Sequence, residues 1–98
     1  MRKRTRVLIV DDEEIVRESL CDWLESVDYR VESAESGEEA LKIIKEKKIN
    51  IMLSDLVMPG INGIELMKKA RKIVPSLSTV IITAHATIQT AITAIREG

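Results

Sequence analysis

Three aspartates follow two short apolar runs, and their type and placement could bind a cation and accept a phosphoryl group. Residues 7–10 lead into Asp11 and Asp12, and residues 49–54 lead into Asp55. If the two runs are neighbouring parallel strands, the three carboxylates meet at the carboxyl edge of one sheet, where open α/β folds place their ligands. Clustered carboxylates repel one another unless a cation neutralises them, so the cluster predicts a Mg²⁺ site. Asp55 stands alone at its strand end, which makes it the preferred nucleophile for forming an aspartyl phosphate.

The same acids also have a purely structural explanation. The acidic residues 11–14 could cap the first helix and complement its dipole, while Asp55 could begin a turn into Pro59 and Gly60. The joint placement of both acidic groups at strand exits favours the chemical explanation.

Further positions could serve a phosphoryl group on Asp55. Thr83 ends the fourth apolar run, and its hydroxyl could donate a hydrogen bond to a phosphoryl oxygen, although β propensity alone also explains a threonine there. The backbone amides of Val57 and Ala84 could add donors. His85 has no second histidine with which to complete a metal triad, so it is left out of the predicted site.

A parallel sheet is needed to position these groups, and the chain alternates four Val- and Ile-rich runs with four segments of helical period. This alternation predicts an α/β fold, a doubly wound parallel sheet built from βαβ units. Strands are expected near residues 6–10, 30–33, 50–54 and 79–83, and helices near 14–26, 36–47, 64–74 and 88–95. A flavodoxin-like strand order, 2-1-3-4, places the first and third strands side by side and the weak second strand at an edge.

The helices carry their own signals. The second helix begins with capping-box spacing from Ser36 to Glu39, and Pro75 stops the third. Cys21 is expected to be a small helix residue, partly or wholly buried. An apolar stripe on the first helix is expected to pack on the sheet, and it comprises Val16, Leu20, Trp23, Leu24 and Val27.

Length and composition bound the class of protein. Ninety-eight residues, 15 of them basic and 16 acidic, indicate one compact domain over residues 1–98. Only Trp23 and Tyr29 are aromatic, so direct nucleic-acid binding is not expected. No apolar run approaches the roughly 20 residues of a membrane span and no signal peptide is visible, so a cytoplasmic location without membrane association is expected.

Three segments together resemble the receiver domain of two-component response regulators: residues 7–13, 53–63 and 80–84. The resemblance implies a regulatory domain rather than an enzyme, in which Asp55 accepts a phosphoryl group from a sensor histidine kinase. It implies that Asp12, Asp55 and the Val57 carbonyl bind Mg²⁺, and that Asp11 acts largely through a metal-bound water. Thr83 would be the switch hydroxyl. Residues 87–98 are similar to the fourth helix of receivers in transcriptional activators of the nitrogen-regulator type.

The family pattern continues into a fifth strand and a fifth helix, which supply a lysine and an aromatic switch residue. We therefore expect a C-terminally truncated receiver, with an unpaired fourth strand and an uncovered apolar face. Such a chain is expected to form a homo-oligomer or a domain-swapped dimer. Two alternatives stay open: a phosphorylation-independent dimerisation or docking module with a vestigial acidic site, and a Mg²⁺-dependent phosphohydrolase using Asp55, for which no separate acid/base residue is apparent.

Overall fold

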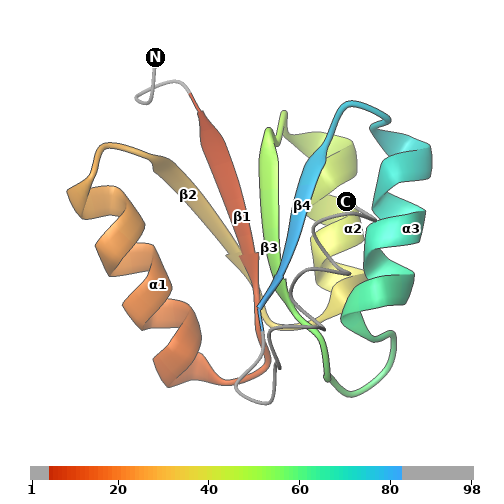
Figure 1. Ribbon diagram of the computed structural model, residues 1–98, viewed down its shortest axis with the longest axis horizontal. Helices are drawn as coiled ribbons and strands as arrows, with labels where there is room; N and C mark the ends of the chain where they lie inside the picture. Colours follow the sequence, from red (N-terminus) through yellow and green to blue (C-terminus); the bar gives the residue numbers. More distant parts are fainter. Residues whose placement is uncertain (1–4, 83–98) are drawn as a thin grey trace.

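The computed structural model describes residues 5–82, which alternate strands with helices (Figure 1). The predicted helix over residues 88–95 lies outside this range. The elements in chain order are β1 (Arg6–Val10), α1 (Glu14–Ser26), β2 (Arg30–Ala34), α2 (Gly37–Glu46), β3 (Ile51–Asp55), α3 (Gly63–Ile73) and β4 (Ser78–Ile82).

The described strands form one parallel sheet in the order β2-β1-β3-β4. This order confirms the predicted arrangement, including the edge position of β2. The register pairs Val10 of β1 with Ser54 of β3, so the next residues, Asp11 and Asp55, lie at the same edge of the sheet. The order in which strands are added reverses between β1 and β3, since β2 lies on one side of β1 and β3 and β4 lie on the other. Ligands bind at this switch point in folds of this kind.

Helices cover the sheet from two sides, with α1 on one face and α2 and α3 on the other (Figure 1). Alternation along β1 explains both layers, because successive side chains of a strand point to opposite faces. Leu8 and Val10 join the core beneath α2 and α3, whereas Val7 and Ile9 pack against α1. Four consecutive buried residues therefore anchor β1 at the centre of the fold.

Side chains cap the starts of α2 and α3. Ser36 Oγ accepts a hydrogen bond from the Glu39 N–H at 3.2 Å, as the capping-box spacing predicts. The Glu39 carboxylate, however, accepts from the N–H of Glu35 rather than that of Ser36. A complete capping box begins α3, where Asn62 and Glu65 satisfy each other's backbone N–H groups.

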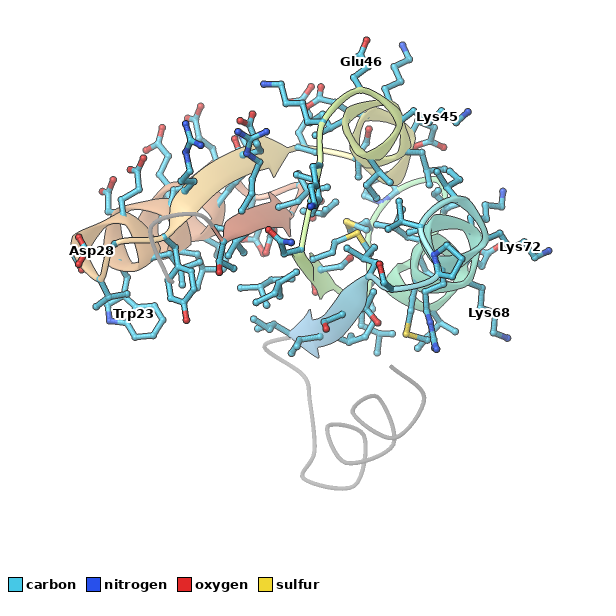
Figure 2. The ribbon with its side chains drawn as sticks, turned by 90° about the horizontal axis from the view of Figure 1, so that it is seen from above. Trp23, Asp28, Lys45, Glu46, Lys68 and Lys72 are labelled. Carbon is cyan, nitrogen blue, oxygen red and sulfur yellow. The ribbon has the colours of Figure 1, made fainter. Side chains whose placement is uncertain are left out.

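The predicted packing stripe on α1 is wrong at two positions. Trp23 is 63% exposed and Val16 is 37% exposed, and Trp23 projects from one flank of α1 (Figure 2). Leu24 is the buried residue of this helix, with Leu20 and half-buried Cys21 packed beside it. Trp23 lies about 100° round the helix from Leu24, so a helix turned to bury Leu24 leaves Trp23 on its flank. The expectation for Cys21 is confirmed.

Candidate functional site

The three predicted aspartates come together at the carboxyl edge of the sheet. Asp11 follows β1, Asp12 begins the turn into α1, and Asp55 ends β3. One oxygen from each carboxylate lies within 4.8 Å of the others. The burial is graded, since Asp11 is buried, Asp55 is half-buried and Asp12 is exposed. The cluster thus combines a sheltered carboxylate with one that solvent and partners can reach.

Asp11 is the most constrained of the three. Its N–H donates to the Ala34 carbonyl at 3.1 Å, and its Oδ1 accepts from the Glu13 N–H at 2.8 Å. Burial raises the pKa of Asp11, the hydrogen bond from Glu13 opposes this, and the negative charges of Asp55 and Asp12 raise the pKa further. One oxygen of Asp11 is therefore committed to the backbone, which leaves the other for an ion or a water.

The start of α3 packs directly on the backbone of Asp55. The Gly63 N–H donates to the Leu56 carbonyl at 2.8 Å, and Ser54 Oγ donates to the Asp55 carbonyl at 2.9 Å. A Cβ added at Gly63 would lie 3.0 Å from Leu56 Cα and closer still to the Asp55 carbonyl oxygen. Only a glycine lets the helix approach the aspartate this closely.

Exposed apolar side chains flank the acidic cluster in the sequence. Ile15, three residues after Asp12, is 79% exposed, and Val57, two residues after Asp55, is 64% exposed. The loop that carries Val57 then turns through Gly60, whose φ of 82° is in the left-handed region that suits glycine.

The donor set fits a hard divalent cation. Mg²⁺ takes oxygen ligands, keeps several waters and is commonly held by one or two protein carboxylates. Asp12 and Asp55 offer accessible oxygens, and the free oxygen of Asp11 can bind a water on the ion. The role of the Val57 carbonyl stays a prediction, and Thr83 and Ala84 lie outside the described residues.

One residue of the site was not predicted from the sequence. Arg17 Nη1 donates a hydrogen bond of 2.8 Å to the main-chain carbonyl of Asp11. An arginine six residues beyond the first acid, near the start of a predicted helix, was the available signal, but a bond from side chain to backbone leaves no periodic trace in a sequence.

The parallel sheet and the acidic cluster at its switch point place this chain in the class of flavodoxin-like α/β domains, which bind ligands at this edge of the sheet. The sequence profile described as "Response regulator receiver domain" matches residues 7–98. The chain belongs to this family, so the predicted family and fold are confirmed. Receiver domains are regulatory signalling domains of two-component systems.

Within residues 5–82, no helix has the length and apolar character needed to cross a membrane.

Relatives and solved structures agree with this assignment. The transcriptional regulatory protein GlrR of Escherichia coli is 34% identical over 96 residues, which are 98% of this chain and 22% of GlrR. The chain thus spans about a fifth of the length of such relatives. The response regulator TrrA of Thermotoga maritima, solved with Mg²⁺-BeF, has a TM-score of 0.80 and 36% identity, with 84% of this chain and 71% of TrrA covered. The beryllofluoride-activated receiver dimer of NtrC4, a protein from Aquifex aeolicus, has a TM-score of 0.84 and 35% identity, with coverage of 95% and 77%.

Proposed function

We propose that this chain is a phosphoacceptor that takes a phosphoryl group from a sensor histidine kinase onto Asp55 in the presence of Mg²⁺. The observation that carries the proposal is the convergence of three carboxylates at the switch point of the sheet. Family membership supports it, because receiver domains interact with histidine kinases. The relative TrrA, which was solved with Mg²⁺-BeF, supports the choice of metal.

In the proposed transfer, a carboxylate oxygen of Asp55 forms a bond to phosphorus while the bond from phosphorus to the donor's imidazole nitrogen breaks. The imidazole leaves with the electron pair of that bond and takes up a proton. Asp12 and Asp55 would hold Mg²⁺, with Asp11 acting through a water, and the bound ion would neutralise charge on the phosphoryl oxygens. We assign the Val57 carbonyl to the metal, and Thr83 and Ala84 to the phosphoryl oxygens, on the family resemblance.

We assign the exposed apolar pair Ile15 and Val57 to contact with the kinase. Ile15 and Val57 follow the acids closely in the sequence, and exposed apolar groups such as these lose water when a partner docks. Replacing Ile15 by glutamate should therefore slow transfer from a kinase while leaving transfer from a small phosphodonor unchanged. Ile73→Glu on α3, also at an exposed apolar position, is the matched control and should affect neither reaction.

We also propose that the chain self-associates, as a homo-oligomer or a domain-swapped dimer. Trp23 and Val16 on α1 and Ile82 at the end of β4 are exposed apolar side chains that a second copy could cover. The beryllofluoride-activated NtrC4 receiver was solved as a dimer, which supports the proposal. Sedimentation should show a mass above that of the single chain, and Trp23→Ser should lower it. A monodisperse monomer would contradict self-association.

The single domain over residues 1–98 and the cytoplasmic location stay predictions.

Intact mass after incubation with a small phosphodonor and Mg²⁺ tests the proposed function. One phosphoryl adduct is expected for the unmodified chain and none for Asp55→Asn. Asp28→Asn is the matched control, because Asp28 lies at the far end of α1 (Figure 2), and its φ of 73° is one that asparagine adopts readily. No adduct, together with biological activity that survives Asp55→Asn, would favour the docking module. Multiple turnover on phosphate esters would favour the phosphohydrolase.

A further inference from the structure

The turn from β1 into α1 is not held by its own cap residue. Glu13 occupies the cap position in an extended conformation, and its side chain accepts no capping hydrogen bond. Residues 11–13 are fixed instead through Asp11, whose N–H, carboxylate and carbonyl each take part in one hydrogen bond. The part of the turn that presents two of the three acids therefore depends on what holds Asp11.

Arg17 supplies the third of these bonds and is the residue that reaches the turn from the helix body. Its own N–H closes the first turn of α1 on the Glu13 carbonyl at 3.0 Å, and its guanidinium folds back to the Asp11 carbonyl at 2.8 Å. A charged donor makes a stronger hydrogen bond to a carbonyl than a neutral one does. Arg17 thus ties the acidic turn to the rigid part of α1.

We propose that Arg17 is a positioning residue for the acidic cluster: by fixing the Asp11 carbonyl, it holds Asp11 and Asp12 at the spacing from Asp55 that Mg²⁺ requires. The inference rests on the proposed function and deepens it. Mg²⁺ accepts little departure from octahedral geometry, so a looser turn binds it less tightly. Arg17 touches neither the ion nor the phosphoryl group in this role.

The charge of Arg17 should weaken Mg²⁺ binding, whereas its positioning of the turn should strengthen it. A fixed positive charge beside the cluster repels Mg²⁺, so removing it would tighten binding if charge alone mattered. Loss of positioning would weaken binding. The sign of the change in Mg²⁺ affinity therefore distinguishes the two roles.

Calorimetric titration with Mg²⁺ on the unmodified chain, Arg17→Met, Arg17→Lys and Arg30→Met tests the proposal. Arg17→Met is expected to raise the Kd for Mg²⁺ about tenfold, the lower end of the effects seen when hydrogen bonds behind metal ligands are lost. Arg17→Lys should restore most of the affinity, because one ammonium N–H can replace the one observed bond. Arg30→Met, an exposed arginine on β2 away from the turn, should leave the Kd unchanged.

The outcomes separate this proposal from the proposed function. An unchanged or tighter Kd for Arg17→Met, with or without a lower Tm, overturns the positioning role while the phosphoacceptor function stands. If Arg17→Met does not fold, Arg17→Gln, which also removes the charge and the long reach, gives the same comparison. An unmodified chain that binds no Mg²⁺ and forms no adduct contradicts the proposed function and this inference together.

Discussion

Replacement of Gly63 by alanine tests whether the start of α3 sets the position of Asp55. The added Cβ would lie 3.2 Å from the Asp55 carbonyl carbon and 3.0 Å from Leu56 Cα, with the Asp55 carbonyl oxygen closer still. All three atoms are backbone, so relief requires α3 to move away from β3. Overpacking of this kind costs about 1–3 kcal/mol. Alanine recovers at most about 0.5–1 kcal/mol of helix propensity.

The expected net effect of Gly63→Ala is a loss of stability of about 1–2 kcal/mol. For a domain of this size, each 1 kcal/mol lowers the Tm by roughly 4–8 °C. The displacement also carries the backbone of Asp55, so the rate of phosphorylation from a small phosphodonor should fall as well.

Gly37→Ala is the matched control, because Gly37 is likewise the first residue of its helix. There the two atoms nearest the added Cβ belong to a side chain and not to backbone, with Ile61 Cδ1 at 2.6 Å and Cγ1 closer. Ile61 is half-buried and can change rotamer, at about 0.5–1.5 kcal/mol, which the helix propensity of alanine largely offsets.

Thermal unfolding and the phosphorylation rate should therefore change for Gly63→Ala and hardly change for Gly37→Ala. Equal Tm losses in the two variants, or a Gly63→Ala protein as stable and as reactive as the unmodified chain, would refute the reasoning.

Three other changes probe separate parts of the structure. Asp11 has a raised pKa, so its contribution to stability is fully present below the ordinary pKa of an aspartate and is lost as pH rises through the raised value. Asp11→Asn should therefore raise the Tm of the metal-free protein at neutral pH, with the gain shrinking toward acidic pH; equal Tm values across the pH range would contradict this. Thr79 Oγ1 is buried without a hydrogen-bond partner among the described residues, so Thr79→Val should stabilise the fold by about 1 kcal/mol in denaturant unfolding, and a loss would show that the hydroxyl is satisfied. Asn62→Ala removes the cap of α3 and should cost about 1 kcal/mol in the same assay; no change would mean that the capping box contributes nothing.

The sequence allowed the sheet and the acidic site to be predicted for one physical reason. Parallel strands in register bring their carboxyl ends to one edge, so Val10 opposite Ser54 is enough to bring Asp11 near Asp55. β1 was recognisable because a strand buried on both faces needs a near-continuous apolar run, whereas β2 at the edge of the sheet gave a weaker pattern.

Helix orientation could not be predicted in the same way. An apolar period shows which residues of α1 share a face, but the angle at which that face meets β1 and β2 depends on packing across the whole sheet. Trp23 and Val16 consequently lie on the flank of α1. Arg17 was not predicted to belong to the site because it acts through one hydrogen bond to a main-chain carbonyl. Many arginines near helix starts make no such hydrogen bond, so the residue type alone does not indicate one.

The central claim is that Asp55 is the residue that becomes phosphorylated. The most direct measurement is to phosphorylate the chain with a small phosphodonor and Mg²⁺, reduce the acyl phosphate with borohydride, and map the modified residue by peptide mass spectrometry. The proposed function predicts conversion at Asp55 alone, dependent on Mg²⁺ and absent in Asp55→Asn. Modification at Asp11 or Asp12 instead, or at no aspartate while Mg²⁺ binds, would contradict it.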